Sequence, residues 1–138
     1  MEVERIRGRW HPEAAAVEPE ITQEEAEAGV RLALRLFERW GLTDREARVL
    51  LGGVSARTYA RWKAGEIGRL ETDRKMRLSL LAGIHKALRS LFTEPERAYG
   101  WISRPNADFE GRRPLDVLLQ GRITDLLDVR AYLDAARG

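Results

Sequence analysis

Signals for helix starts and helix stops alternate along this sequence and leave little room for any other secondary structure. Thr22 and Thr43 are each followed three residues later by a glutamate. In that pattern a threonine hydroxyl and a glutamate carboxylate bind the first free backbone amides of a helix. Glycines follow the apolar stretches that these signals open, where a helix end favours a left-handed residue. No stretch of strand length alternates apolar and polar residues, so the sequence predicts an all-α fold.

The predicted helices follow one another closely. Apolar residues recur at helical spacing in six or seven segments. We expect these helices over residues 22–40, 43–51, 55–64, 72–92, 93–102, 114–120 and from about 124 almost to the C-terminus, with a loop over 103–113. Residues 1–21 contain Pro12 and Pro19, which interrupt helices, and are predicted to form a loose arm.

Composition limits the chemistry that the chain can perform. A length of 138 residues with 43% hydrophobic residues suits one compact domain or two very small ones. The absence of cysteine excludes disulfides, thiolate zinc sites and cysteine nucleophiles, and His11 and His85 lie far apart, so we expect no metal and no cofactor. No apolar run is long enough to span a bilayer and no secretory segment opens the chain, so we expect a cytoplasmic protein.

Charge is distributed unevenly behind a net charge of +2. Residues 1–40 carry a net −3, residues 41–90 a net +6, and residues 91–138 a net −1. A basic segment in the middle of a chain indicates an anionic partner there. The C-terminal third is therefore expected to have a different role.

Two short helices predicted in the basic segment have the form of a helix–turn–helix. They cover residues 43–51 and 55–64 and are joined across Gly52-Gly53. In the second helix Tyr59 and Trp62 lie three residues apart and are expected to pack inward. The alternative is a basic amphipathic helix that only covers a core.

The opposite face of that second helix carries the residues suited to DNA. Arg57 and Arg61 are four residues apart and share one face with Thr58. Arginine is the usual donor to guanine in the major groove and also binds phosphates. We therefore expect Arg57, Thr58 and Arg61 to contact bases, and Ser55 and Lys63 to contact phosphates.

The last third of the chain contains no catalytic arrangement. Residues 91–138 have no Ser/His pair, no phosphate-binding loop and no HExxH sequence. His85 lies inside the long helix predicted over 72–92 and is expected to be a polar face residue rather than a base. We expect a binding protein, not an enzyme.

Two motifs in order resemble a known family. The segment from Gly111 to Arg122, GRRPLDVLLQGR, follows a loop with Asn106 and precedes a last amphipathic helix. It resembles the C-terminal toxin-binding domain of Xre/MbcA/ParS-type antitoxins. The segment from Leu50 to Trp62 resembles the Xre-like helix–turn–helix that precedes this domain in the family. The resemblance covers roughly residues 22–138.

The resemblance implies a type II antitoxin with a helix–turn–helix over 22–90 and a small helical toxin-binding domain over 91–138. In this family the partner is a RES-domain toxin that degrades NAD⁺, and the last helix or tail of the antitoxin covers the NAD⁺ pocket. The complex also binds double-stranded operator DNA and represses its own operon. A homodimer on paired half-sites is expected, since one unit of this size would bind weakly.

The resemblance also implies which residues serve the partner. Residues expected to shape the toxin-binding domain are Asn106, Phe109, Gly111, Pro114, Leu115, Leu118, Leu119 and Gly121. Residues of the last helix expected to reach the toxin are Arg130, Leu133 and Arg137. A pocket for the anionic NAD⁺ must be basic, so Asp125, Asp128 and Asp134 are expected to offer complementary carboxylates. For the leucines, ordinary core packing is the alternative.

Other functions remain open at this point. The chain could be a stand-alone transcription regulator whose C-terminal half only dimerises. The helix–turn–helix could also be degenerate and serve dimerisation alone. An enzyme would need a convergent polar pocket with perturbed ionisable groups, and the sequence offers none.

Overall fold

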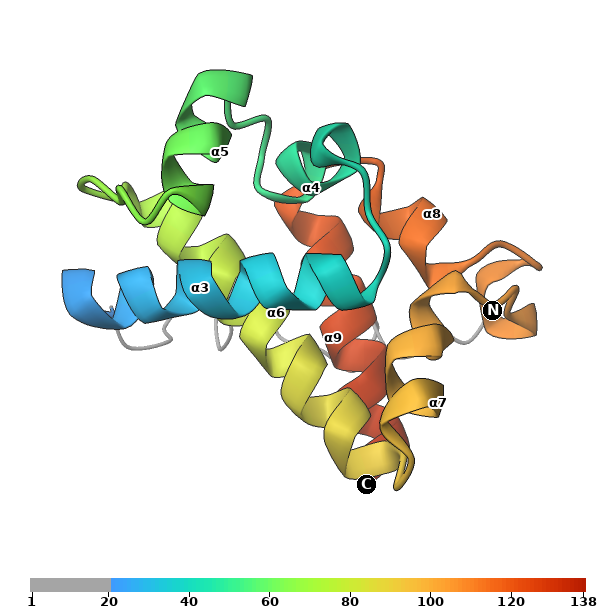
Figure 1. The fold of residues 1–138 in the computed structure, drawn as a ribbon. Coiled ribbons are helices and arrows are strands. Elements are labelled where there is room, and N and C mark those ends of the chain that lie inside the picture. The colour runs from blue at the N-terminus through green and yellow to red at the C-terminus, as the bar shows by residue number, and fades with distance from the viewer. Residues whose placement is uncertain (1–20) are drawn as a thin grey trace.

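The computed structural model describes residues 21–138, which contain helices and connecting turns and no strand (Figure 1). The predicted all-α fold is therefore confirmed, while the arm expected over residues 1–21 lies, apart from Ile21, outside the described residues. The helices are α3 (Gln23–Arg39), α4 (Asp44–Leu50), α5 (Ala56–Lys63), α6 (Thr72–Leu91), α7 (Pro95–Gly100), α8 (Pro114–Leu118) and α9 (Ile123–Arg137). Single turns of 3₁₀-helix, η1 (Trp101–Ser103) and η2 (Ala107–Phe109), follow α7.

Side-chain caps fix the starts of the first helices. The hydroxyl of Thr22 accepts from the amide of Glu25 at 3.1 Å, and the Glu25 carboxylate accepts from the amide of Thr22 at 3.0 Å. Thr43 and Glu46 form the same pair at 3.1 and 2.9 Å. Ser55 accepts from the amide of Thr58 at 3.1 Å. These three predicted helix starts are confirmed.

The helix start expected at Thr93 is wrong. Its position is taken by Glu94, which precedes Pro95 and has extended dihedral angles, φ −87° and ψ 124°. A residue before proline is pushed out of the helical region, and proline itself favours the first helical position. Helix α7 therefore begins at Pro95 without a side-chain cap.

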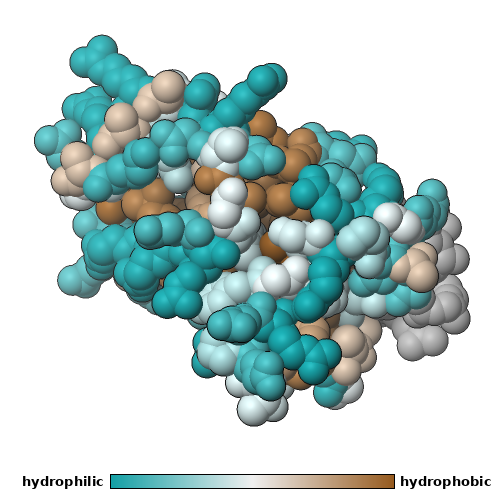
Figure 2. All heavy atoms as spheres, turned by 45° about the vertical axis from the view of Figure 1, so that its right-hand side comes forward, coloured by the Kyte–Doolittle hydropathy of each residue, from teal (hydrophilic) through white to brown (hydrophobic). Residues whose placement is uncertain are grey.

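Helix α6 is the centre of the fold. It packs against α3 and against α9 (Figure 1). One continuous cluster of buried apolar residues joins the N-terminal and C-terminal halves. Gly83 leaves room for the Arg130 side chain of α9, because a Cβ atom there would lie 2.6 Å from its Nε. On the face drawn in Figure 2, hydrophilic side chains surround a patch of apolar atoms in the upper middle. Among residues 21–138 no helix is long and apolar enough to cross a membrane.

Both glycines of the turn between α4 and α5 adopt left-handed backbone conformations. Gly52 and Gly53 have φ angles of +86° and +82°, which favour glycine. Nε of Arg48 donates to the carbonyl of Val54 at 2.9 Å and closes the turn. Helix α5 thereby stands at the surface of the bundle, beside α4 (Figure 1).

Candidate functional site

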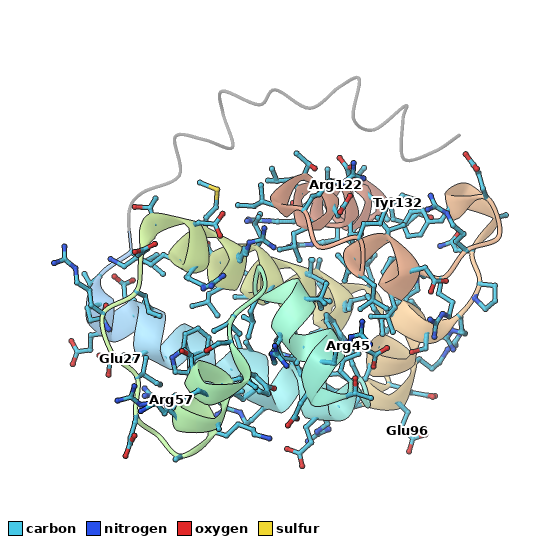
Figure 3. All side chains as sticks on the ribbon, turned by 90° about the horizontal axis from the view of Figure 1, so that it is seen from above. Glu27, Arg45, Arg57, Glu96, Arg122 and Tyr132 are labelled. Atoms are coloured by element: carbon cyan, nitrogen blue, oxygen red, sulfur yellow. The ribbon has the colours of Figure 1, made fainter. Side chains whose placement is uncertain are left out.

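Helix α5 packs on the core through aromatic side chains and directs its arginine side chains towards solvent. Tyr59 and Trp62 are each 5% exposed, as expected. Arg57 is exposed and forms no hydrogen bond or ion pair with any residue from 21 to 138, and Figure 3 shows it pointing away from the bundle. Arg61 is also exposed, with Nε 3.7 Å from a carboxylate oxygen of Glu66. The two arginines thus have the exposure that a DNA contact requires.

Other predicted DNA contacts are engaged within the chain. The hydroxyl of Ser55 also donates to Oγ1 of the half-buried Thr58 at 3.0 Å. Nζ of Lys63 lies 2.9 Å from a carboxylate oxygen of Asp44 and 5.3 Å from the centre of the Tyr59 ring. Burial, and then the charge of Asp44, raise the pKa of Tyr59. Lys63 therefore fastens α5 to α4 and would have to leave Asp44 to reach a phosphate.

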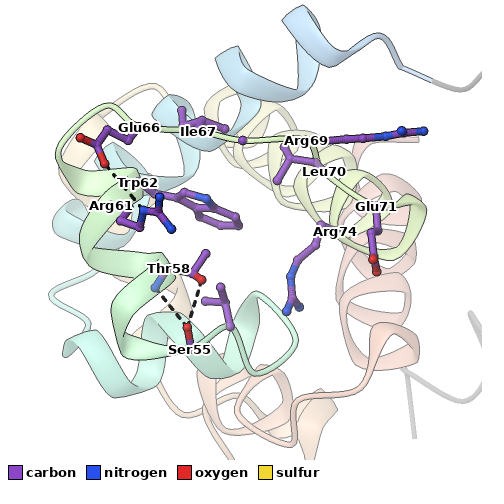
Figure 4. A pocket seen from close by; sticks show the side chains of 12 residues that line it. Ser55, Thr58, Arg61, Trp62, Glu66, Ile67, Arg69, Leu70, Glu71 and Arg74 are labelled. Atoms are coloured by element: carbon purple, nitrogen blue, oxygen red, sulfur yellow. Dashed lines mark hydrogen bonds and ion pairs between the residues drawn. The ribbon is translucent and has the colours of Figure 1, made fainter.

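A groove of about 900 Å³ lies between α5 and the start of α6. Figure 4 shows the ring of Trp62 on one of its sides and Arg74 on another, while Arg69 extends away from it. Sequence reasoning did not place Arg69 or Arg74 near α5, because they come from the turn and helix that follow. Arg69 and Arg74 add guanidinium groups to the lining beyond α5, beside the carboxylates of Glu66 and Glu71.

The apolar residues of the C-terminal motif form its interior. Phe109 is fully buried, and Pro114, Leu115, Leu118 and Leu133 are also buried. For Leu115, Leu118 and Leu133 the core alternative applies, so the expectation that Leu133 reaches a partner is wrong. They shape the domain from within and are not at its surface.

Asn106 and the glycines of the same motif set backbone geometry. Asn106 accepts from the amide of Asp108 at 2.9 Å and starts η2, inside the segment expected to be a loop. Gly111 and Gly121 have φ angles of +79° and +82°, and Leu119 is half-buried. These residues determine where α8 and α9 point.

The expectation that Asp125 and Asp128 face a partner is wrong. They are 1% and 7% exposed, because they lie on the face of α9 that carries the buried Val129. Asp134 is exposed as expected and lies 3.6 Å from Nε of Arg130 and 3.5 Å from a guanidinium nitrogen of Arg137. The polar group at the free end of α9 therefore consists of Arg130, Asp134 and Arg137.

Helices α8 and α9 begin with the same capping interaction between an arginine and an aspartate, which sequence reasoning missed. The carboxylate of Asp116 accepts from the backbone amide of Arg113 at 3.0 Å and from its guanidinium at 2.6 Å. Asp125 accepts from the amide and the guanidinium of Arg122, both at 3.0 Å. The guanidinium of Arg113 lowers the pKa of Asp116. The Arg-x-x-Asp spacing, which occurs at both helix starts, was the signal available in the sequence.

Aromatic rings gather beside α9. Tyr132 stacks on Trp101 with ring centres 6.0 Å apart, and Phe109 lies edge-on to Tyr132 at 4.9 Å. The hydroxyl of Tyr132 donates to the carboxylate of Asp108, and burial first and that bond second raise the pKa of Tyr132. Trp101 and Tyr132 are half-buried, so part of each ring reaches the surface. Aromatic residues of this kind are enriched at protein interfaces.

His85 is part of a stacked group between α3, α6 and α7. Its ring lies 5.8 Å from that of Tyr99, with Nε2 3.1 Å from the tyrosine hydroxyl, and the guanidinium of Arg39 lies 5.1 Å above Tyr99. Burial lowers the pKa of His85, and the positive charges of Arg89 and Arg35 lower it further. In residues 21–138 no three side chains of the types that bind metals come together.

The fold and both sites define a helix–turn–helix protein whose helical C-terminal module packs on the same core through α6. Comparison with protein families identifies residues 19–83 as an antitoxin Xre-like helix-turn-helix domain and residues 87–138 as an antitoxin Xre/MbcA/ParS C-terminal toxin-binding domain. The chain belongs to the Xre/MbcA/ParS antitoxin family, so the resemblance expected from the sequence is confirmed.

Two relatives illustrate the match. Mycobacterial cidal antitoxin MbcA of Mycobacterium tuberculosis is 34% identical over 98 residues, which cover 69% of this chain and 84% of MbcA. Protein y4oB of Sinorhizobium fredii is 47% identical over 104 residues, which cover 75% of this chain and 80% of that protein. Both matches cover most of the length of the relative.

Proposed function

We propose that this chain is a type II antitoxin that neutralises a RES-domain, NAD⁺-degrading toxin by covering its active site and represses its own operon by binding DNA. Residues 22–90 would bind DNA and residues 91–138 the toxin. The observation that carries the proposal is the pairing, within one family member, of an outward guanidinium pair on α5 with a C-terminal toxin-binding module. Its action is binding without chemistry, in the cytoplasm.

The DNA contacts would come from the exposed face of α5. Arg57, Thr58 and Arg61 would read bases in the major groove, and Ser55 would approach a phosphate. Lys63 would join them only after leaving Asp44. Because one recognition helix buries little surface, a homodimer on paired half-sites is the expected binding form.

The toxin contacts would come from the opposite side of the molecule. Figure 3 shows Arg57 far from Arg122 and Tyr132, so a partner on α9 would leave α5 free. The end of α9, with the exposed Asp134 and Arg137 and the half-buried Arg130, would cover the NAD⁺ pocket. Both partners could then be bound at once, which repression by the complex requires.

Co-expression with the RES-domain toxin tests the proposal, with growth and cellular NAD⁺ as readouts. The full chain should restore both. Deletion of residues 134–138, which leaves the buried Leu133 in place, should abolish rescue, whereas Arg57→Ala should rescue fully. Rescue by the deletion variant would contradict occlusion by the end of α9.

DNA binding is tested with a gel shift on the DNA upstream of the gene. A contact through phosphates should weaken steeply as salt rises. Operator binding without rescue from any RES-domain toxin would instead support a stand-alone transcription regulator.

A further inference from the structure

Arg77 of α6 joins the helix–turn–helix to the C-terminal module. It is 8% exposed, and its Nη1 donates to the carbonyl of Leu50 at 3.4 Å and to that of Gly121 at 3.0 Å. Leu50 is the last residue of α4, and Gly121 lies in the turn between α8 and α9. Nε of Arg77 donates to Asp73 at 3.0 Å, which balances the charge. One buried guanidinium therefore holds backbone from both halves.

Close contacts surround this guanidinium on the α4 side and at the α8–α9 turn. Arg74 donates to the carbonyl of Leu51, next to the Arg77 contact. At Gly52 a Cβ atom would lie 2.7 Å from Nη1 of Arg74 and 2.7 Å from Nε of Arg77. At Gly121 a Cβ atom would lie 3.3 Å from Cγ1 of Val49. We therefore expect a shift of the α8–α9 turn to move the end of α4 or to break the contact with Arg77.

Helix α5 is tied to α4 and follows it. Arg48 holds the carbonyl of Val54 in the turn, and Lys63 holds Asp44 at the start of α4. The carbonyls at the end of α4 carry partial negative charge, which suits guanidinium donors. Contacts thus run without a break from Gly121 through Arg77 and α4 to the exposed face of α5.

We propose that Arg77 is a positioning residue that couples the α8–α9 turn to the recognition helix. Movement of Gly121 when a partner engages the C-terminal module is transmitted to α5 and changes DNA affinity. By linkage, DNA changes the affinity for the partner by the same factor. The functional part of this inference rests on the proposed function, whereas the mechanical coupling does not.

A double-mutant cycle read by amide hydrogen exchange tests the coupling in the free chain. Gly121→Ala, placed at a φ of +82°, should speed exchange of residues 50–54 by about tenfold. In an Arg77→Met background these amides already exchange fast, and Gly121→Ala acts on α4 only through the tight contact with the Val49 side chain, so it should add less than about twofold. In an Arg74→Met background, which keeps the Gly121 contact, Gly121→Ala should retain its effect.

Gly111→Ala is the matched control, since Gly111 has a φ of +79° in the same module and nothing within 4 Å of a Cβ atom. Gly111→Ala should leave the exchange rates of the amides of residues 50–54 unchanged. The exchange rates of the α3 amides report any global loss of stability. Equal effects of Gly121→Ala and Gly111→Ala on residues 50–54 would overturn the inference. Arg77→Lys replaces Arg77→Met if the latter does not fold.

The functional arm measures operator affinity with and without the RES-domain toxin. The ratio of the operator affinity with toxin to the operator affinity without toxin should differ from one in the natural chain and approach one in Arg77→Lys. A ratio of one in the natural chain, or an unchanged ratio in Arg77→Lys, would overturn the functional coupling. If the natural chain binds neither partner, the proposed function fails while the exchange result stands on its own.

Discussion

Helix α5 and the C-terminal module use the same charged residue types in opposite ways. Arg57 on α5 faces solvent and has no partner among residues 21–138. Arg113 and Arg122 each bind the aspartate three residues later and fix a helix start. Asp125 is 1% exposed, so even a carboxylate of this module belongs to its interior. The role of a charge in this protein depends on which side of its helix packs.

The two regions differ in which residues pack in the interior and which remain exposed for a partner. On α5 the aromatic side chains pack into the core, whereas Arg57 and Arg61 are exposed and Arg61 has only the nearby Glu66 as a partner. In the C-terminal module most motif residues form the scaffold, and the exposed end of α9 and the edges of the Trp101–Tyr132 stack remain for a partner. Substitutions should therefore separate binding from stability on α5, and much less so in the motif.

The largest expected effect is on the buried cap of α9. Asp125→Ala removes a carboxylate that is 1% exposed and leaves the part-buried amide of Arg122 without its acceptor, so it should lower the free energy of unfolding by about 2–3 kcal/mol. Asp116→Ala removes the equivalent, more exposed pair of α8 and should cost about 1 kcal/mol. Urea unfolding of both variants measures the difference. Equal losses would show that burial does not distinguish the two caps.

The next effect concerns recognition by α5. Arg57→Ala should weaken operator binding by about 1–3 kcal/mol. It should change unfolding by less than about 0.5 kcal/mol, because the side chain is exposed. Fluorescence anisotropy with labelled operator DNA measures the first and urea unfolding the second. Arg97→Ala, an exposed arginine on α7, is the charge-matched control and should bind as the natural chain does.

An exposed cap in the helix–turn–helix should matter less than the buried one in α9. Thr43→Ala removes the acceptor of the Glu46 amide and should cost about 1 kcal/mol of stability. Thermal unfolding followed by circular dichroism measures it, with Thr43→Ser as the conservative control. A loss as large as that of Asp125→Ala would remove the contrast between the two regions.

The smallest expected effect is a pH dependence of the free energy of unfolding caused by His85, which lies between α3, α6 and α7. Its pKa is lowered in the folded state, so the unfolded state binds more protons below about pH 6.5. Stability should therefore fall as the pH drops from about 7 towards 5.5. His85→Gln should remove that part of the decrease in urea unfolding at each pH. Identical pH profiles for both chains would contradict a lowered pKa.

Much of the helix–turn–helix was predictable because its signals are local. Thr22, Thr43 and Ser55 each cap a helix with residues no more than three positions away, and the spacing of Tyr59 and Trp62 indicates the inward face. The helix start predicted at Thr93 was wrong for an equally local reason. Pro95 pushes Glu94 out of the helical region, and this effect outweighed the capping pattern.

The sequence by itself determined the helical class, most helix limits, the outward pair on α5 and the family, because periodicity, caps and motif order depend on neighbouring residues. Only the tertiary structure decided that Asp125 and Asp128 lie inside, and that Arg77 joins Leu50 to Gly121 across 71 residues of chain. These contacts depend on how α6 and α9 pack, and packing is a property of the whole core rather than of any one segment.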